Sequence, residues 1–284
     1  MSHIVGAITF KYALANPYQD VLLTVIVGEK LNDAKTKEPD YGNWVSLRII
    51  YLPGGLGLVA LLLSLIVPLL LIPAIVFILI AAYFAYAHHL FSPCGKDIQR
   101  RTRQMVVDSI EWDGKGRALD IGCGNGAITI MLAKKFPDAQ VTGIDCWGKE
   151  WDHSKAACER NATIEGVIDR VTFQRASASS LPFDDGSYDI VISNLTFHEV
   201  KDTKDKRTVI REALRVLKDG GRFSFQDLFL FKYVYGDLNE LLVMISDCGI
   251  SEVEFVETRD SDFIPSVLRL PFMLGTMGMI VGKK

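Results

Sequence analysis

Hydrophobic residues gather in one long run near the start of the chain, and the remaining sequence alternates apolar with polar positions. Between Arg48 and Lys96 there is no Asp, Glu, Lys or Arg. One membrane-spanning helix needs about 20 apolar residues, and this run is much longer. Pro68 and Pro73 interrupt it near its middle, and proline breaks or kinks a helix. The pattern predicts a transmembrane hairpin within residues 49–95, with short helices over Gly54–Leu71 and Ala74–Phe91.

Basic residues flank the apolar run on both sides. Arg48 precedes it, and Lys96, Arg100 and Arg101 follow it. Basic flanks favour the cytoplasmic side of a membrane, and two cytoplasmic ends require a hairpin. A single tilted and kinked span with apolar flanks is the alternative. No polar stripe divides the run, which argues against a helix pair buried in a water-soluble fold. We therefore expect the lipid bilayer as a partner, with the folded domain on the cytoplasmic face.

The hairpin divides the chain into three predicted parts. Residues 1–48 form a cap segment, to which the sequence gives no chemical role. Residues 49–95 form the hairpin, and residues 96–284 form the folded domain. This domain opens with "KDIQRRTRQMVVDSIEW", whose amphipathic pattern predicts a helix with a basic first half near the lipid headgroups.

Short apolar runs alternate with helical patterns from Arg117 onward. This alternation predicts an α/β domain with a parallel sheet and helices on both faces. A ligand of such a sheet binds at the carboxyl ends of its strands. The predicted strands are Arg117–Ile121, Gln140–Ile144, Arg170–Gln174, Tyr188–Ser193, Gly221–Gln226, Glu252–Glu257 and Met277–Val281. The predicted helices between them include Ala127–Lys135, Ser154–Glu165, Asp205–Leu217 and Asp237–Asp247.

Charge and cysteine content exclude several classes of partner. The formal net charge of −3 over 284 residues supplies no global basic field, so nucleic acid is not an expected partner. The five cysteines are scattered and form no CxxC pair, which is neither a disulfide framework nor a zinc-binding pattern. We expect a reducing compartment, mostly buried thiols and no metal.

The stretch "ALDIGCGNGAITI" carries the strongest chemical signal. It leads from a strand into a helix through Gly122, Gly124 and Gly126. Gly122, Gly124 and Ala127 also satisfy the dinucleotide-binding pattern G-x-G-x-x-G/A. Asp120 and the third glycine point away from a dinucleotide, because the strand there is usually apolar and the extra glycine lets backbone approach a ribose. Asp145 ends the second strand about 20 residues later, where a carboxylate accepts hydrogen bonds from ribose hydroxyls.

Four ordered segments carry a family resemblance. "LDIGCGNG", "VTGID", "VTFQRASASSLPFDDGSYDIVISN" and "REALRVLKDGGRF" resemble successive motifs of class I S-adenosylmethionine-dependent methyltransferases. The resemblance extends from about Asp97 to the C-terminus. It implies a Rossmann-like sheet of seven strands whose last strand, in "MGMIVGKK", is antiparallel to its neighbours. It also implies S-adenosyl-L-methionine as the cofactor.

The resemblance implies roles for residues at several strand ends. The three glycines would wrap the methionine and ribose of the cofactor, Asp145 would hold the ribose, and Cys146 or Trp147 would cover the adenine. Ser177 and Ala178 fall where the family carries an acidic residue followed by alanine, so the serine is a departure. The expected cofactor-binding residues are Asp120, Gly122, Gly124, Asn125, Gly126, Asp145, Cys146, Trp147, Ser177, Ala178 and Asn194.

Candidate catalytic residues follow the fourth and fifth strands. His198 and Glu199 come just after Asn194, over the cleft where the transferred methyl group must lie, and Asp227 ends the fifth strand. A histidine of ordinary pKa is the natural base for a hydroxyl or carbon acid. An amine or thiol acceptor needs less help, and His198 would then only position it.

The sequence therefore predicts a membrane-anchored methyltransferase that acts on an amphiphilic or other small-molecule acceptor. A second apolar stretch, Phe263–Gly275, is expected to dip into the membrane interface, or alternatively to pack as a core loop. Two other functions remain as alternatives, a nicotinamide-dependent reductase of Rossmann type and a non-catalytic membrane scaffold that binds adenosylmethionine.

Overall fold

A computed structural model of the chain describes residues 38–148 and 153–284. Most of the cap segment predicted for residues 1–48 lies outside the described residues. Asp40–Lys284 form one compact unit, which contains both the apolar helices and the sheet. The division of the chain into three domains stays a prediction.

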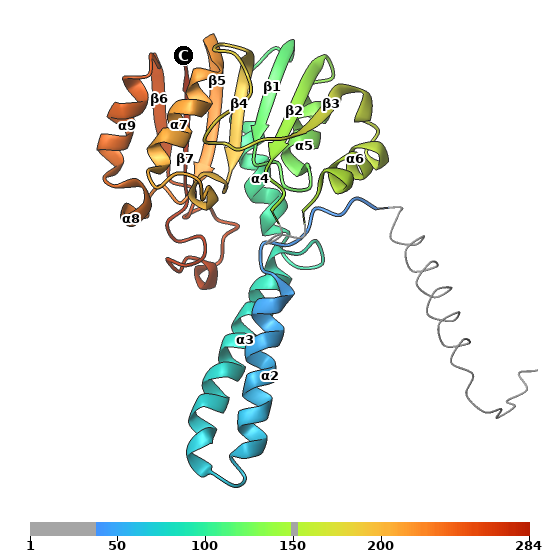
Figure 1. The fold of residues 1–284 in the computed structure, drawn as a ribbon, viewed down its shortest axis with the longest axis vertical. Coiled ribbons are helices and arrows are strands. Elements are labelled where there is room, and N and C mark those ends of the chain that lie inside the picture. The colour runs from blue at the N-terminus through green and yellow to red at the C-terminus, as the bar shows by residue number, and fades with distance from the viewer. Residues whose placement is uncertain (1–37, 149–152) are drawn as a thin grey trace, which may run out of the picture. The chain divides into compact units, whose positions relative to one another are not determined.

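One sheet of seven strands forms the centre of this unit (Figure 1). Its spatial order is β3-β2-β1-β4-β5-β7-β6. Neighbouring strands from β3 to β5 are parallel, and β7 lies antiparallel between β5 and β6. The predicted seven-stranded sheet with an antiparallel last strand is confirmed. The strands are β1 Gly116–Ile121, β2 Ala139–Asp145, β3 Val171–Arg175, β4 Tyr188–Asn194, β5 Leu217–Asp227, β6 Glu252–Val256 and β7 Gly278–Lys283.

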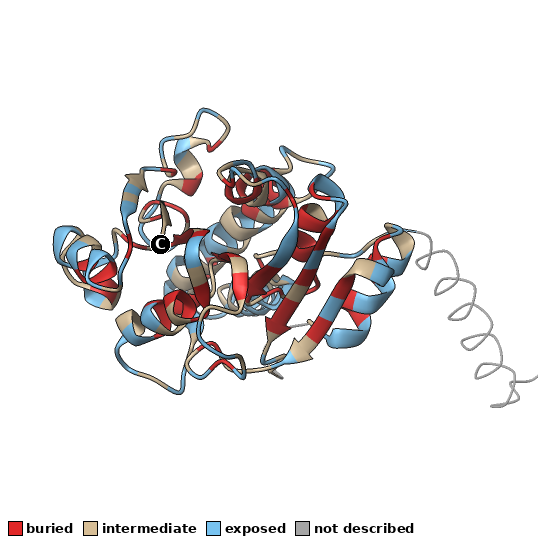
Figure 2. Ribbon diagram, turned by 90° about the horizontal axis from the view of Figure 1, so that it is seen from above, coloured by how far each residue is buried: buried red, intermediate tan, exposed pale blue. Residues whose placement is uncertain are grey.

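Helices cover both faces of the sheet (Figure 2). The central strands are therefore buried on both sides, which matches their near-continuous apolar sequences. In β1, Leu119 and Ile121 point into the core on one face and Ala118 into the core on the other. The first face is covered by α7 Lys206–Arg215, α8 Lys232–Tyr235 and α9 Leu238–Ser246. The second is covered by α4 Ile98–Asp108, α5 Ala127–Lys135 and α6 Lys155–Ile164. Short 3₁₀ turns lie at η2 Ile168–Arg170, η3 Phe197–Glu199 and η4 Ser266–Leu268.

Two apolar helices, α2 Leu47–Leu63 and α3 Leu71–Phe91, pack side by side (Figure 1). Gly57 permits the close approach, since a Cβ there would lie 2.9 Å from the Ile78 side chain. The predicted helical pair is present, but the bounds predicted for its first helix, Gly54–Leu71, are wrong.

Proline chemistry explains the difference in bounds. Val67 precedes Pro68 and is extended, as a residue before proline tends to be, so the turn falls at Ser64–Val67 and not at the prolines. Pro68 then begins the 3₁₀ turn η1, Pro68–Leu70. Pro73 lies in the first turn of α3, where a backbone N–H has no partner within the helix and its loss costs nothing.

Length and composition distinguish the two helices. Pro68–Phe91 is one continuous helical stretch of 24 residues that is long and apolar enough to cross a membrane. The 17 residues of α2 fall below the usual length for a full span. Apolar side chains of both helices are largely exposed, among them Leu62 at 67% and Leu79 at 63%.

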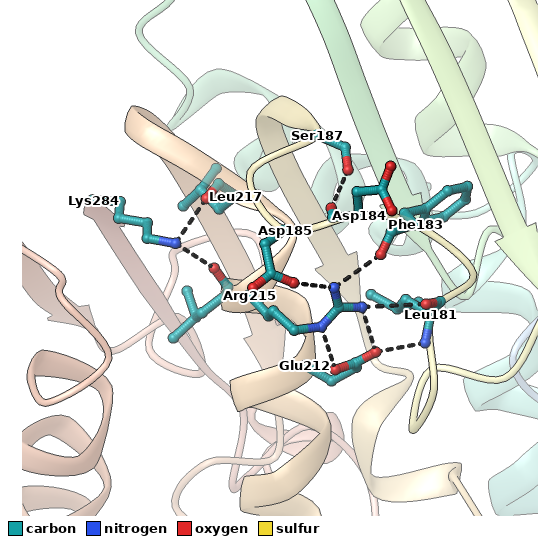
Figure 3. A network of polar contacts seen from close by, with 10 residues as sticks. Leu181, Phe183, Asp184, Asp185, Ser187, Glu212, Arg215, Leu217 and Lys284 are labelled. Atoms are coloured by element: carbon teal, nitrogen blue, oxygen red, sulfur yellow. Dashed lines mark hydrogen bonds and ion pairs between the residues drawn. The ribbon is translucent and has the colours of Figure 1, made fainter.

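A polar network fixes the segment that leads into β4, at the amino end of that strand (Figure 3). The Arg215 guanidinium donates to the Phe183 and Leu181 carbonyls and pairs with Asp185 and Glu212. Glu212 in turn accepts from the Leu181 N–H at 2.7 Å. The network ties the "LPFDDGS" segment to α7, and its role is structural.

Removing a ring from the core should destabilise the fold. Phe225 is fully buried and packs against Phe197 and Phe223. We expect Phe225→Ala to lower the unfolding free energy by about 3–5 kcal/mol, because the cavity adds to the lost burial. Chemical denaturation of the full chain in detergent solution measures this. Tyr233→Ala is the matched control, since that ring is 93% exposed. Equal losses in the two variants would contradict the assignment of the core.

Candidate functional site

The glycine loop lies at the carboxyl end of β1, between that strand and α5. Gly122, Gly124 and Gly126 all have positive φ, at +77°, +57° and +82°. Such angles favour glycine, because a side chain would be strained there. A Cβ at Gly122 would lie 2.0 Å from the Thr196 side chain, so this glycine also permits a close approach from the turn after β4. The loop sits where the strand order reverses between β1 and β4, the expected binding edge of such a sheet.

Asp145 holds the glycine loop from the end of β2. One carboxylate oxygen accepts from the Gly124 N–H at 2.9 Å and the other from the Trp147 N–H at 2.8 Å. The Trp147 indole N–H donates back to the Gly124 carbonyl at 2.9 Å. A carboxylate has further lone pairs, so Asp145 can still accept from a ligand hydroxyl. Trp147 is therefore tied to the loop, while the neighbouring Cys146 is exposed.

Asp120 is buried near the end of β1, just before the loop. It is 1% exposed and accepts from the Thr129 hydroxyl at 2.7 Å. Burial raises the pKa of Asp120 to about 6, although the Thr129 hydrogen bonds oppose the shift. The carboxylate therefore ties the end of β1 to α5, and its assignment as a direct cofactor ligand stays a prediction.

Ser177 and Ala178 follow β3. Ala178 is buried, and the Ser177 hydroxyl donates to the Asp202 carboxylate at 2.5 Å. The same carboxylate accepts from the Ser179 hydroxyl at 2.7 Å, and these hydrogen bonds lower the pKa of Asp202. A carboxylate from a distant loop is thus placed at the serine where the family resemblance implied an acidic side chain.

Residues 40–46 form a strap that runs past the glycine loop into α2. The Asp40 carbonyl accepts from the side-chain amides of Asn125 at 3.3 Å and Asn161 at 2.8 Å. Asn161 is fully buried and also donates to the Asn125 carbonyl at 3.0 Å. The predicted residue Asn125 therefore faces the strap. Sequence reasoning missed Asp40 and Asn161, because 121 positions separate them and no local pattern links them.

The turn after β4 is held by β5. Asn194 donates from its side-chain amide to the Gln226 side-chain oxygen at 2.8 Å, and the Leu195 N–H donates to the Gln226 carbonyl at 2.7 Å. Leu195 has a φ of +51°, which a leucine rarely adopts. This conformation directs Thr196 toward Gly122, and the Thr196 hydroxyl lies 3.1 Å from the Asn194 carbonyl.

His198 and Asp227 form a close pair at the ends of β4 and β5. The His198 Nδ1 lies 2.6 Å from one Asp227 oxygen, which also accepts from the Leu228 N–H at 2.7 Å. The other oxygen accepts from the Phe197 N–H at 2.8 Å. The opposite ring nitrogen of His198 lies 3.4 Å from Glu199. The side chains of His198 and Asp227 are 20% and 1% exposed, so the structure brings all three predicted catalytic residues together.

The charge of His198 differs from the expectation for an ordinary histidine. Burial lowers its pKa, but the charge and hydrogen bond of Asp227 and the nearby Glu199 outweigh burial and raise the pKa to about 10. His198 is therefore a cation at neutral pH. The ordinary pKa of about 6.5 applies to the unfolded chain, so the ion pair makes its full contribution to stability below about pH 6.5. This contribution is lost as the pH rises through about 10, where the folded protein releases the His198 proton.

The part of the chain that carries this site is similar to known methyltransferases. Residues 119–225 match the family model described as a methyltransferase domain. The matched segment runs from β1 into β5, so it includes the glycine loop, Asp145 and His198. Asp227 lies just beyond its end.

Curated relatives match over the same region. A 27-O-demethylrifamycin SV methyltransferase of Amycolatopsis mediterranei is 40% identical over 40% of this chain and 39% of its own length. A ubiquinone/menaquinone biosynthesis C-methyltransferase of Geotalea daltonii is 30% identical over 49% of this chain and 58% of its own. The chain thus spans about half the length of these relatives.

The solved structure of geranyl diphosphate C-methyltransferase from Streptomyces coelicolor, in complex with S-adenosyl-L-homocysteine, has the same fold. Its TM-score is 0.50 at 16% identity, with 66% of this chain and 79% of that chain covered. Together these matches support a class I methyltransferase fold and S-adenosyl-L-methionine as the cofactor. The loop conformation and the Asp145 carboxylate fit a ribose-bearing ligand.

Removing the Asp145 carboxylate should weaken cofactor binding. We expect Asp145→Ala to lower the affinity for S-adenosylmethionine by about 10- to 150-fold, the equivalent of a charge-assisted hydrogen bond of about 1.5–3 kcal/mol. Titration calorimetry measures the affinity, and thermal unfolding verifies that the variant is folded. Asp219→Ala, at an exposed aspartate outside the loop, should bind as the unmodified chain does. Unchanged affinity in a folded Asp145→Ala variant would remove Asp145 from the site.

Proposed function

We propose that this chain is a membrane-anchored methyltransferase that moves a methyl group from S-adenosylmethionine to an amphiphilic or other small-molecule acceptor. The observation that carries the proposal is that two features lie at the same edge of the sheet. These are the glycine loop held by Asp145 and the His198–Asp227 pair on the neighbouring strands. Both stand at the carboxyl ends of β1, β2, β4 and β5, where parallel sheets bind their ligands.

This arrangement suggests separate roles for the cofactor and for the protein side chains. Bound S-adenosylmethionine supplies an electrophilic methyl group on a positively charged sulfur. The protein then has to align the acceptor, and such positioning is worth up to about 7–11 kcal/mol. Asn194 and Thr196 line the turn between the loop and His198, and they are the side chains proposed to orient the reactants. His198 is proposed to take the proton that a hydroxyl or carbon acid loses.

The raised pKa of His198 limits its action as a base at neutral pH. With a pKa of about 10, about one His198 in 10³ is neutral at pH 7. A general base contributes about 10²–10⁴-fold, so at neutral pH the small neutral fraction offsets most of that gain. A proton-accepting role therefore becomes effective only as pH rises. In its charged form, His198 favours an acceptor whose reacting oxygen is already an anion.

Exposed apolar surface supports the proposed anchoring. The charge-free stretch from Ile49 to Gly95 contains all of α3 and all but the first two residues of α2, and the apolar side chains of these helices face outward over most of their length. A surface with this many exposed leucine and isoleucine side chains has a high free energy in water and a low one in lipid. We propose that the pair is a membrane hairpin and that the methyltransferase domain lies on the cytoplasmic face, because basic residues flank both ends.

Turnover separates this proposal from the alternatives. The full chain in detergent is incubated with methyl-labelled S-adenosylmethionine and a membrane extract, and the products are extracted and counted. Label transferred to an extracted molecule supports the methyltransferase. Cofactor binding without transfer would favour a scaffold, and binding of a nicotinamide dinucleotide in place of S-adenosylmethionine would favour a reductase.

The pH dependence of methyl transfer should reveal the role of His198. We expect the rate to rise about tenfold per pH unit between pH 7 and 9 and to level near pH 10. Asp227→Asn should move the profile to lower pH, because it removes the charge that raises the His198 pKa. His198→Ala should lower the rate and leave S-adenosylmethionine affinity nearly unchanged. A flat profile from pH 6 to 9 would exclude His198 as the base and leave it as a positive charge beside the acceptor.

Charges placed on the exposed hairpin surface should release the protein from membranes. We expect the unmodified chain to stay with the membrane after an alkaline carbonate wash. Combined Leu58→Asp, Leu62→Asp, Val76→Asp and Leu79→Asp should move it to the supernatant. A charge costs about 2.5–3.5 kcal/mol at the centre of a bilayer and less toward its edges, and these four side chains are 49–67% exposed.

The control places the same charge on exposed apolar residues of the domain. Tyr233→Asp and Val243→Asp, at positions 93% and 60% exposed, should leave the membrane fraction unchanged. Release of the unmodified chain by carbonate would contradict the anchoring.

A further inference from the structure

The segment between β6 and β7 carries an exposed apolar surface next to α3. The Tyr83 hydroxyl on α3 donates to the Val267 carbonyl at 3.0 Å. The Phe272 ring lies 6.0 Å from the Tyr83 ring and 6.5 Å from the Phe84 ring, centre to centre. The segment is therefore attached to the hairpin by a hydrogen bond and by aromatic contacts.

One side of this segment is anchored in a hydrophobic cluster and the other is open. Ile264, Leu268, Leu274 and Met277 are buried with the base of the hairpin. Phe272 is 65% exposed and Leu270 is 38% exposed. The alternative of a packed core loop therefore does not hold for these two residues, although their neighbours do pack as a core.

The single charged side chain of the stretch is turned back into the protein. The Arg269 guanidinium donates to the Ile264 carbonyl at 3.0 Å and pairs with Asp260 at 3.0 Å. Its charge is therefore neutralised within the segment. The surface around Phe272 keeps an apolar character.

The length of α3 gives the depth of Phe272 relative to the hairpin. At about 1.5 Å per residue, Leu79 lies about 16 Å and Tyr83 about 22 Å from Pro68 along the helix. The hydrocarbon core of a bilayer is about 30 Å thick. If the core begins at Pro68, Tyr83 lies inside it, and Phe272 beside Tyr83 lies at the same level. Lipid then contacts the Phe272 ring directly.

We propose that Pro265–Leu274 is a second membrane contact, with Leu270 and Phe272 inserted into the acyl chains beside α3. The occupant of this surface is the lipid bilayer. The inference rests on the proposed insertion of the hairpin and adds a second point of contact. Because the domain packs directly against the hairpin, the second contact restricts the tilt of the whole unit relative to the membrane.

The second contact brings lipid close to the proposed methyl-transfer edge. Leu195 and Leu228 pack in the same cluster as Ile264 and Leu268. These leucines directly follow Asn194 and Asp227 in the chain. The apolar cluster therefore connects the segment that carries Phe272 with the residues next to that edge, which suits an amphiphilic acceptor that enters from the membrane.

Fluorescence quenching by brominated lipid tests the contact. The full chain is reconstituted in phosphatidylcholine vesicles whose acyl chains carry bromine either near the headgroup or near the chain end. Three single variants each add one tryptophan at an exposed position, Phe272→Trp, Leu79→Trp and Val243→Trp. For each variant, the tryptophan emission in excess of that of the unmodified chain is measured in brominated and in unbrominated vesicles. Thermal unfolding verifies that each variant is folded.

We expect bromine near the headgroup to remove most of the emission added at Phe272→Trp, and bromine near the chain end to remove most of that added at Leu79→Trp. Val243→Trp on α9 should lose none. Quenching at Leu79→Trp without quenching at Phe272→Trp would overturn the second contact and leave the hairpin in place. Quenching at neither position would overturn both this inference and the proposed anchoring.

Discussion

A single buried carboxylate organises the edge of the sheet at which the site lies. Asp227 is fully buried, and a charge removed from water is stable only when its oxygens have partners. Its partners are the Phe197 and Leu228 N–H groups and the His198 ring. These hydrogen bonds fix the turn after β4 against the end of β5. The conformation of that turn sets the orientation of the His198 ring and the positive φ of Leu195. It also brings Thr196 close to Gly122.

The same edge also meets the apolar hairpin. Ala87 and Phe91, at the end of α3, pack with Leu195 and Leu228 in one cluster. No flexible linker separates α3 from the domain, because Ser92–Asp97 makes its own backbone hydrogen bonds and α4 begins at Ile98. A force that positions α3 therefore acts on the residues that hold His198 and Asn194. The site and the hairpin are parts of one packed unit.

Local patterns in the sequence were sufficient for the sheet, because strand and helix periods depend on residues close together in the chain. All seven strands and helices α5, α6, α7 and α9 lie near their predicted bounds, and the glycine loop has the expected backbone. The turn of the hairpin was misplaced, since Pro68 acts on the residue before it and Pro73 is tolerated in a first turn. The pKa of His198 could not be predicted, because its value is set by Asp227, 29 positions away.

The contacts between the strap and the glycine loop could not be predicted from local sequence patterns. Asn161 and Gln99 are buried polar side chains of α6 and α4, and a buried amide without partners costs about 1–3 kcal/mol. Their partners are backbone groups of the strap, since Asn161 bonds to Asp40 in both directions and Gln99 bonds to Gly42 and Trp44.

The strap then enters α2 directly, with Ser46 as the helix N-cap. The glycine loop thus depends on the chain that leads into the hairpin, through Asn125 and its bond to the Asp40 carbonyl. The glycine loop and the apolar helices are connected twice, through this strap at the start of α2 and through the cluster at the end of α3. Their relative positions are therefore set by buried contacts on both sides of the hairpin.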